Sequence, residues 1–368
     1  MKAAILDRYI FKELLWPFLF GIAMFTVLFM ATGPIFDMAN LVIQYGVPFF
    51  TVVEYAIIRM PSFIALTIPM SVLLSTLVAF GRLSVDHEMI AMKAGGISFY
   101  RMLVPVVVFS VGATAVCYFL NAKLGPESLY KAKVIVESGR TAGHFPQLEN
   151  IKFTSKSSDG TERITIARSF NEEDGIMHAP VINDYAKNGE LMRITHAQQA
   201  FWKDNKWILV NGETFQFDEK GIFQSQLSFS SAELDLSQNP REVGMLERGP
   251  DEMDNALLKK TITLMERDPL RDKDEVRSMW VRYRLREALP FACLVFALVG
   301  APSGIRPVRS TSSAGVAMSV FIILIYYFFV ATFKSLGDHG TLSPFAAAWV
   351  PNIVFSAVGA GFLVKEGT

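Results

Sequence analysis

Five apolar stretches frame this chain, and a polar block of roughly 150 residues interrupts them after the third. Each stretch approaches the ~20 residues that an α-helix needs to cross ~30 Å of hydrocarbon. A sixth stretch, Ala288–Gly300, is apolar for only 13 residues, but Val281–Glu287 can extend it as one helix. The sequence therefore predicts a membrane protein with three spans, a large extramembrane domain and three further spans. The five longer stretches are Leu14–Pro34, Pro61–Phe80, Met102–Leu120, Val316–Phe333 and Phe345–Val364.

Composition agrees with helices that face lipid. Hydrophobic residues make up 51% of the chain and charged residues only 19%, a balance that suits membrane spans better than a soluble enzyme. The formal net charge is zero, so nothing indicates a nucleic-acid partner. Cys117 and Cys293 both lie inside apolar stretches and predict neither a disulfide framework nor a metal cluster. The first stretch is too long for a cleaved signal peptide, which predicts a retained anchor.

Lysine and arginine residues are unevenly divided between the short loops, and this bias predicts the orientation. The loops on one side, Gly33–Met60 and Lys334–Pro344, contribute only Arg59 and Lys334. Both termini are therefore expected in the cytoplasm and the polar block outside. The nine basic residues on the cytoplasmic side are Lys2, Arg8, Lys12, Arg82, Lys93, Arg101, Arg306, Arg309 and Lys365.

Within the polar block, continuous apolarity gives way to the alternation of β-strands. Asn211-Gly212 is a turn signal after Trp207–Val210, and Phe215–Phe217 with Ile222–Phe229 predicts a hairpin across Asp218–Gly221. Several short strands between Ser, Asn, Asp and Gly clusters indicate an antiparallel sandwich or roll. Such a domain is either a rigid spacer or a roll that accepts lipid or adds strands from a partner.

Pro250–Trp280 then turns helical and amphipathic, with apolar residues at three- and four-residue spacing and a break at Asp268-Pro269. A second helical run begins near Arg271 and continues toward the fourth span. This segment predicts a tether that returns the β domain to the membrane.

The segment between the second and third spans predicts a short amphipathic helix over residues 82–95 on the cytoplasmic face. Leu83, His87, Ile90 and Ala94 fall on one helical stripe, and Gly95-Gly96 ends the helix. Such a helix either anchors in the membrane interface or docks into a groove on a cytoplasmic motor. The pattern leaves both interpretations open.

No motor is encoded in the chain itself. It has no G-x-x-x-x-G-K-[ST] phosphate loop, and its five histidines are scattered without a plausible Ser–His–Asp set. The spans also lack the carboxylates that mark a proton relay. The sequence therefore predicts no catalytic residue, no metal and no cofactor, and a permease would need another subunit for its energy.

Four segments, in order along the chain, resemble one family: Ile5–Glu13, Ile68–Gly96, Ile194–Gly212 and Arg284–Gly304. That family is the lipopolysaccharide export permeases, the F and G subunits of the Lpt transporter. The resemblance covers essentially the whole chain, including the interrupting β domain. The turn Lys334–Pro344 and the residues around Glu88 make the F subunit slightly the better match.

The resemblance implies an α-helical protein of the bacterial inner membrane, with six transmembrane helices (3+3) and an inserted all-β periplasmic jellyroll-like domain. The expected domains are residues 1–121 for the first three spans, 122–249 for the β domain, 250–280 for the tether and 281–368 for the last three spans.

The resemblance also implies partners. Family members pair as two permease subunits around a V-shaped cavity and bind a dimeric cytoplasmic ATPase through the helix between spans two and three. They extract lipopolysaccharide and pass it to periplasmic jellyroll proteins that bridge toward the outer membrane. Glu88 occupies the position of the acidic residue in the family's coupling helix. The expected ATPase-coupling residues are Arg82, Leu83, Asp86, Glu88, Ile90 and Met92.

Spans one and five carry the bulkiest aromatic and aliphatic faces, which suit either acyl chains in a cavity or ordinary contact with bilayer lipid. From these two faces and from two arginines before the fourth span, the expected lipid-binding residues are Phe25, Leu28, Phe29, Thr32, Arg282, Arg286, Phe321, Ile325 and Phe329.

The chain departs from the family at the outer end of span one. Family permeases often carry basic residues there, but Ala31–Asp37 has none. Four arginines cluster just before span four instead. They either snorkel and pair with Glu275 and Glu287, or Arg282 and Arg286, one turn apart, grip phosphate.

Two other functions stay open. One is a membrane-anchored envelope scaffold whose β domain recruits proteins without moving lipid. The other is a permease for another lipid or for lipoproteins, of the related lipoprotein or macrolide exporter type. Those exporters usually have four spans and a differently placed outer domain, so the span count discriminates.

Overall fold

The structure is a computed structural model that describes residues 2–44, 46–140, 148–156, 162–171, 175–186, 190–203, 206–218, 221–234, 248–267, 272–305 and 312–367. Its contacts divide the chain into two units. The helical unit comprises Met1–Val42, Phe49–Ala132 and Pro250–Thr368, and the second unit comprises Ile43–Pro48 and Lys133–Gly249.

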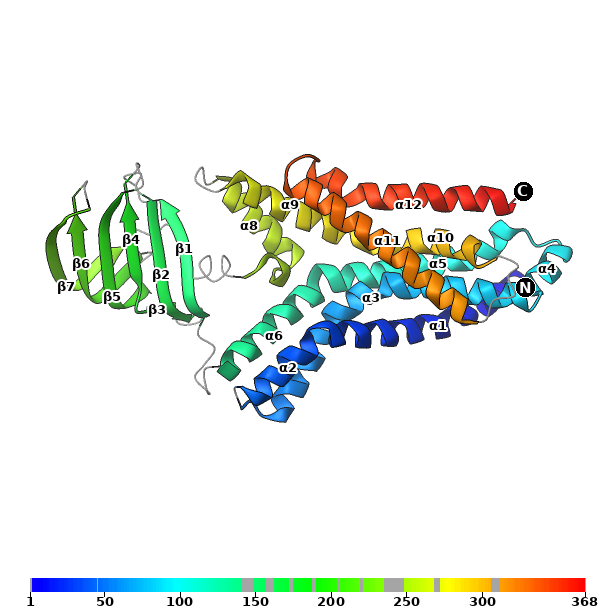
Figure 1. Cartoon of the computed structure of the whole chain (residues 1–368), viewed down its shortest axis with the longest axis horizontal. Helices are drawn as coiled ribbons and strands as arrows, with labels where there is room; N and C mark the ends of the chain where they lie inside the picture. Colours follow the sequence, from blue (N-terminus) through cyan, green and yellow to red (C-terminus); the bar gives the residue numbers. More distant parts are fainter. Residues whose placement is uncertain are drawn as a thin grey trace. The chain divides into compact units, whose positions relative to one another are not determined.

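Six helical stretches in the described residues are long and apolar enough to cross a membrane. Three precede the β insert and three follow it (Figure 1), which confirms the predicted arrangement. The fourth stretch includes Val281–Glu287, as the sequence predicts, and a 3₁₀ turn at Pro290 divides it. The six stretches are α1 (Lys2–Thr32), α3 (Phe49–Val85), α5–η1–α6 (Phe99–Phe119, Leu120–Leu124, Gly125–Arg140), α9–η3–α10 (Lys273–Ala288, Leu289–Phe291, Ala292–Gly304), α11 (Ser312–Asp338) and α12 (Pro344–Gly367).

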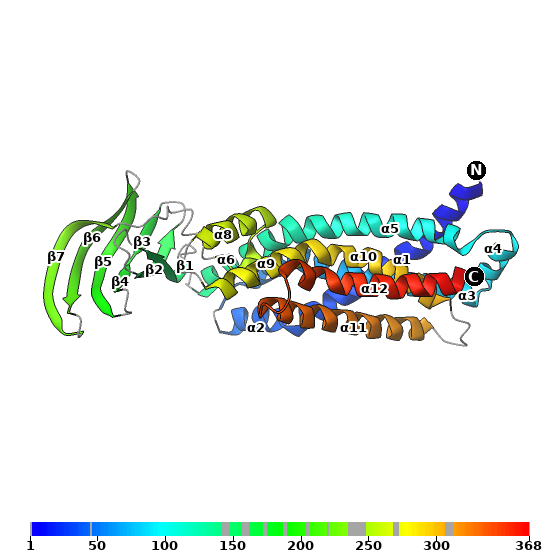
Figure 2. The same cartoon turned by 90° about the horizontal axis from the view of Figure 1, so that it is seen from above.

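Shorter helices connect these stretches. The N-terminus of α1, α4 and the C-terminus of α12 lie at one end of the helical unit, which we call the α4 end (Figures 1 and 2). The short helices are α2 (Pro34–Ile43), α4 (Glu88–Ala94), η2 (Pro250–Glu252) and α8 (Asn255–Arg267).

The third span extends well beyond its apolar stretch. It continues to Arg140 through the π-helical turn η1, so the expected boundary between residues 121 and 122 lies inside a helix. Gly125-Pro126 would normally end a helix because proline lacks a backbone N–H. The wider turn accommodates it, with Gly125 N donating to the Leu120 carbonyl. The expected boundary at residue 280 likewise falls inside α9.

Helix α3 is the central helix of this unit. Its most apolar window is 78% buried, whereas the corresponding windows of α1 and α11 are only 22% buried. Four buried hydroxyls on α3 bond to carbonyls one turn earlier on the same helix, so they need no partner from a neighbouring span. These residues are Thr67, Ser71, Ser75 and Thr76.

Helix α10 approaches α3 very closely at Gly300. A Cβ atom added there would lie 2.1 Å from Thr76 Oγ1 and 3.2 Å from Leu73 Cδ1. Thr76 is wholly buried and its hydroxyl already bonds to the Val72 carbonyl at 3.0 Å. Because any larger residue would displace this side chain, glycine sets the distance between the two helices.

A buried chain of hydrogen bonds joins the last three spans. Tyr326 Oη on α11 donates to Asn352 Oδ1 on α12 at 2.7 Å, and Asn352 Nδ2 donates to the Ala288 carbonyl of α9 at 2.8 Å. The 3₁₀ turn that follows Ala288 interrupts the regular pattern of backbone hydrogen bonds in the helix. Asn352 therefore satisfies a buried carbonyl that would otherwise face hydrocarbon.

The described strands form one seven-stranded antiparallel sheet with the order β1-β2-β3-β5-β6-β7, in which β4 pairs with β2 and β5. The predicted antiparallel β insert is therefore confirmed, and within the described residues its strands form a single sheet. The strands are β1 (Leu148–Lys156), β2 (Glu162–Asn171), β3 (Ile176–His178), β4 (Val181–Tyr185), β5 (Leu191–Lys203), β6 (Lys206–Phe217) and β7 (Phe223–Leu234).

The predicted hairpin across Asp218–Gly221 is present as β6 and β7, but the predicted turn at Asn211-Gly212 is wrong. Strand β6 runs straight through that dipeptide, with Asn211 at a φ of 50°. A Cβ atom at Gly212 would lie 2.4 Å from the Phe229 ring of β7. The Cβ atom would also collide with the His196 backbone carbonyl of β5. Glycine is needed here because neighbouring strands approach the backbone closely, not because the chain reverses.

We expect Gly300→Ala to lower stability by about 1–3 kcal/mol, because the added methyl group overpacks the contact between α10 and α3. Gly112→Ala on α5 is the matched control, since a Cβ atom there meets nothing within 4 Å. Thermal unfolding of the purified protein, followed by tryptophan fluorescence, measures both. Equal melting temperatures for the two variants would show that the close approach does not limit packing.

Candidate functional site

The connection between α3 and α5 is two helical pieces rather than the single predicted helix over residues 82–95. Helix α3 ends at Val85 and α4 begins at Glu88, because His87 adopts a left-handed φ of 57°. The predicted stripe through Leu83, His87 and Ile90 is therefore broken at His87. The predicted end at Gly95-Gly96 is correct, and Gly96 has a φ of 83°.

The six predicted coupling residues differ in how far they are exposed to solvent. Leu83 is only 1% exposed and packs with Met89 in the helical core, so it lies off the surface that a partner could touch. Ile90, by contrast, is 64% exposed on α4. Arg82 and Asp86 are exposed, and Glu88 and Met92 are half-buried. The exposed surface of this connection thus combines two large apolar side chains, Val85 and Ile90, with charged ones.

Polar contacts tie this connection to α1. Arg82 Nη1 donates to Glu13 Oε2 at 3.1 Å, and Arg82 Nε lies 3.5 Å from Asp86 Oδ2. Glu88 Oε2 accepts a hydrogen bond of 2.7 Å from Tyr9 Oη. The sequence pattern identified Arg82, Asp86 and Glu88 but not the α1 partners, which lie 69 and 79 positions away. No periodicity connects residues so far apart.

The predicted lipid-binding residues of α1 do not all face outward. Phe25 is 3% exposed and packs with Leu73 and Phe296, so it belongs to the core; its assignment to a lipid surface is corrected by this packing. Leu28 is 57% exposed, Thr32 is exposed and Phe29 is half-buried. Only the last two turns of α1 therefore offer an apolar surface at the predicted positions.

On α11 the three predicted residues lie on or near the surface. Phe321 is 61% and Ile325 37% exposed. Phe329 is half-buried and stacks on Phe333 with a centroid distance of 6.2 Å. It also packs edge to face with Phe355 of α12, with 5.8 Å between the ring centroids. These rings give α11 a rigid apolar face.

A cavity of about 490 Å³ opens between α1, α3 and α11 at the α4 end. Its apolar wall includes Trp16, which is 75% exposed, and Phe20, which is 62% exposed. Lys12, Glu13 and Arg82 stand at its rim. An apolar wall with charges at one end is the shape expected of a surface that contacts an amphiphile.

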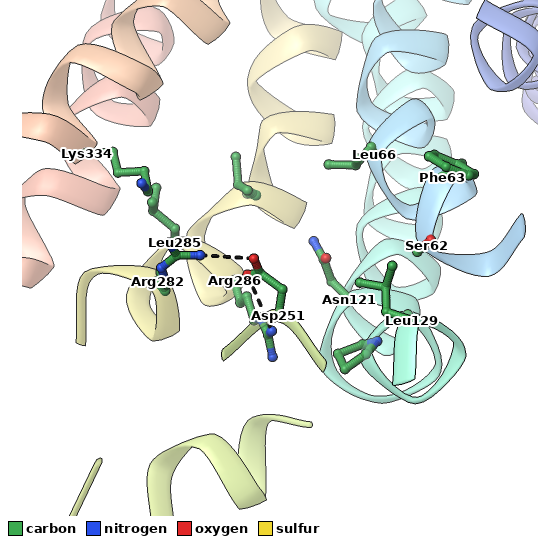
Figure 3. Close-up of a pocket in the computed structure, with 13 residues that line it drawn as sticks. Ser62, Phe63, Leu66, Asn121, Leu129, Asp251, Arg282, Leu285, Arg286 and Lys334 are labelled. Atoms are coloured by element: carbon green, nitrogen blue, oxygen red, sulfur yellow. Dashed lines mark hydrogen bonds and ion pairs between the residues drawn. The ribbon is translucent and has the colours of Figure 1, made fainter. Parts of the chain in front are cut away.

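A second cavity, of about 310 Å³, lies at the opposite end of the helical unit and contains the predicted arginines (Figure 3). Arg282 Nη1 pairs with Asp251 Oδ2 of η2 at 3.0 Å. Arg286 donates to the backbone carbonyls of Pro250 and Met253, and its side chain is only 11% exposed. Arg286 therefore fastens η2 to α9, whereas Arg282 remains partly open to the cavity.

The remaining charges near this cavity are paired locally. Arg284 pairs with Glu287 at 2.8 Å. Glu287 is one of the two carboxylates predicted as partners of the four arginines if their role is structural. Lys334 Nζ lines the cavity and lies 3.2 Å from Asp338 Oδ2 on the same helix. The cavity floor is apolar and includes Phe63, Leu66 and Leu129. The cavity as a whole joins an apolar floor to a cationic side.

Arg286→Met should destabilise the protein by about 1.5–3 kcal/mol, since it removes charge-assisted hydrogen bonds to two backbone carbonyls. Arg282→Met, one turn away on α9, should cost less than about 1 kcal/mol because its ion pair is partly exposed. Thermal unfolding of the two variants side by side measures the difference. A larger loss for Arg282→Met would contradict these assignments.

Among the described residues, no group of three or more His, Cys, Asp or Glu side chains is placed to hold a metal ion. Comparison with curated proteins finds no match. The model of the family described as the lipopolysaccharide export system permease LptF/LptG matches residues 8–365, nearly the whole chain. The six apolar helices and the antiparallel β insert agree with this match. The chain therefore belongs to the LptF/LptG family of lipopolysaccharide export system permeases.

Proposed function

We propose that this multi-pass inner-membrane permease works with a dimeric cytoplasmic ATPase that docks on α4. In the proposed cycle, a second permease subunit of the F or G type completes a cavity, lipopolysaccharide is extracted from the inner membrane, and the β domain passes it to periplasmic jellyroll proteins. The observation that carries the ATPase contact is α4 itself, a separate helix that exposes Ile90 and leaves Glu88 half-exposed.

The proposed orientation places the α4 end, with both termini, in the cytoplasm. The distribution of basic residues supports this orientation, because nine Lys and Arg residues of the sequence fall in the terminal and loop segments assigned to this side. Ser84 Oγ donates to the Ile305 carbonyl at 3.2 Å, so the end of α10 also lies at the α4 end. The β insert, which follows α6 and precedes α8, is then periplasmic. The strands of this domain lie between Leu148 and Leu234, within the expected range of residues 122–249.

The lipid path is proposed along the outer faces of α1 and α11. Both helices are largely uncovered, and both flank α3. Leu28 and Phe321 are more than half exposed, and Phe29 and Phe329 are half-buried beside them. A second permease subunit placed against these faces would enclose acyl chains between apolar walls.

Arg282 is the proposed contact for an anionic head group at the periplasmic end. It lines a cavity that Lys334 also lines, and its side chain is 34% exposed despite its pairing with Asp251. Arg286 supports this position indirectly by holding η2 in place. Span one offers no basic residue between Ala31 and Asp37, so α9 and α11 supply the cations in this proposal.

Glu88→Lys should abolish or strongly reduce co-purification of the ATPase, because the reversed charge meets a groove that fits a carboxylate. Glu54→Lys is the control, since Glu54 is exposed near the start of α3, away from the α4 end. The measurement is the ratio of ATPase to permease after affinity purification, with membrane insertion checked for both. Unchanged ATPase yield and turnover in Glu88→Lys would favour the interpretation of α4 as an interfacial anchor. If no ATPase co-purifies even with the Glu54→Lys control, the result would favour a membrane-anchored scaffold.

A photo-crosslinking residue at Phe29 or Phe329 should capture lipopolysaccharide in the assembled complex, because both positions border the proposed path. Val108 on α5 is the matched control, because it is 63% exposed on a span outside that path. Mass analysis of the adducts identifies the captured lipid. Equal capture of lipopolysaccharide from Val108 would show that the label reports bulk lipid and not a path.

A further inference from the structure

Three polar side chains within two turns of α1, Asp7, Tyr9 and Glu13, hold α4 and the segments on either side of it. Asp7 forms a bidentate pair with Arg101 at the start of α5, with distances of 2.7 and 2.8 Å. Tyr9 donates to Glu88 at the first position of α4. The N-terminal part of α1 therefore contacts the chain both at α4 and immediately after it.

Apolar side chains beside these polar contacts also pack α1 against the α4 connection and the start of α5. Ile10 and Leu14 on α1 are wholly buried in one cluster with Leu83, Met89 and Phe99. Met89 is the buried side of α4, next to Glu88 in the chain. Because α4 has only seven residues, it cannot hold its own position by helix propensity. Its orientation depends on these contacts with α1.

The hydrogen bond from Tyr9 constrains the side chain on which docking depends. Glu88 is half-buried, and its Oε2 atom accepts a hydrogen bond of 2.7 Å from the Tyr9 hydroxyl. A carboxylate has capacity for further hydrogen bonds, so Glu88 can bond to Tyr9 and to a partner at once. A side chain that is already fixed in one rotamer loses less entropy when it binds.

We propose that Tyr9 is a positioning residue that orients Glu88 for the ATPase and joins α4 to α1, so that a displacement of α4 is transmitted along α1 to the lipid-facing residues. This inference rests on the proposed function and adds the route by which docking reaches the lipid path. Helix α1 carries both ends of the route, since Tyr9 and Phe29 lie roughly 30 Å apart along a continuous helix at 1.5 Å per residue.

Pro17 gives this route a defined bending point. Proline has no backbone N–H, so the carbonyl of Glu13 loses its regular helical partner. Glu13 is also the residue whose side chain binds Arg82. The segment of α1 that grips the α4 connection therefore ends where the helix bends most easily, and the segment beyond it carries Leu28 and Phe29.

The test is Tyr9→Phe in the full-length permease, with Tyr100→Phe as the matched control because Tyr100 is a 53% exposed tyrosine at the start of α5. The first readout needs no ATPase. Hydrogen exchange of the α4 amides should accelerate about 5- to 10-fold in Tyr9→Phe, which corresponds to the net loss of one ordinary hydrogen bond at a partly exposed site. The control should exchange like the parent. Unchanged exchange in Tyr9→Phe would overturn the proposal.

The second readout uses the assembled permease–ATPase complex. Lipopolysaccharide released per ATP hydrolysed should fall about 5- to 10-fold in Tyr9→Phe. The same substitution in a Glu88→Ala background, which lacks the acceptor oxygen, should add little because both changes break one contact. Additive losses, or an unchanged ratio despite faster exchange, would overturn the positioning role. If Glu88→Lys binds the ATPase normally, the proposed docking fails, and the exchange experiment still decides whether Tyr9 holds Glu88.

Discussion

The close approach of α10 to α3 is the contact on which the arrangement of the other spans depends. Membrane helices cannot rely on water to drive them together, so short backbone distances and dispersion contacts must hold them. Gly300 permits that distance, and the hydroxyls of α3 avoid any need for polar partners by bonding to their own helix. With α3 fixed at the centre, α1 and α11 are held on only part of their surfaces. Their uncovered faces are the ones available to lipid or to another subunit.

Charged side chains act differently at the two ends of the helical unit. At the α4 end they join elements far apart in the chain, through Tyr9–Glu88 and Asp7–Arg101. At the opposite end, three pairs lie within one helical turn and fix only side-chain positions. Arg282 and Arg286 differ, because they bind Asp251 and the carbonyls of Pro250 and Met253 and so join α9 to the segment that begins with η2. At the α4 end, polar contacts therefore join α1 to α4 and to α5, which suits the proposed docking of an ATPase there.

The sequence was sufficient for the spans, the inserted sheet and the β6–β7 hairpin, because hydrophobic runs and turn residues are local signals. It failed where a distant contact decides the outcome. Asn211-Gly212 has the composition of a turn, but the His196 carbonyl of β5 and the Phe229 ring of β7 make glycine necessary inside a strand. Phe25 and Leu83 have the right spacing for a surface, yet neighbouring helices cover them. The partners of Arg286 are main-chain oxygens, which no side-chain pattern identifies.

The hydrogen bonds through Asn352 have a consequence for how the chain is made. Asn352 lies in the last span, so neither Tyr326 nor the Ala288 carbonyl can find this partner until α12 has been synthesised and inserted. Until then, two polar groups of earlier helices face hydrocarbon or a temporary partner, at a cost in free energy. Biogenesis of the C-terminal half thus ends with a polar contact that only a complete chain can form. A chain that stops before residue 352 therefore leaves both the Tyr326 hydroxyl and the Ala288 carbonyl without this partner.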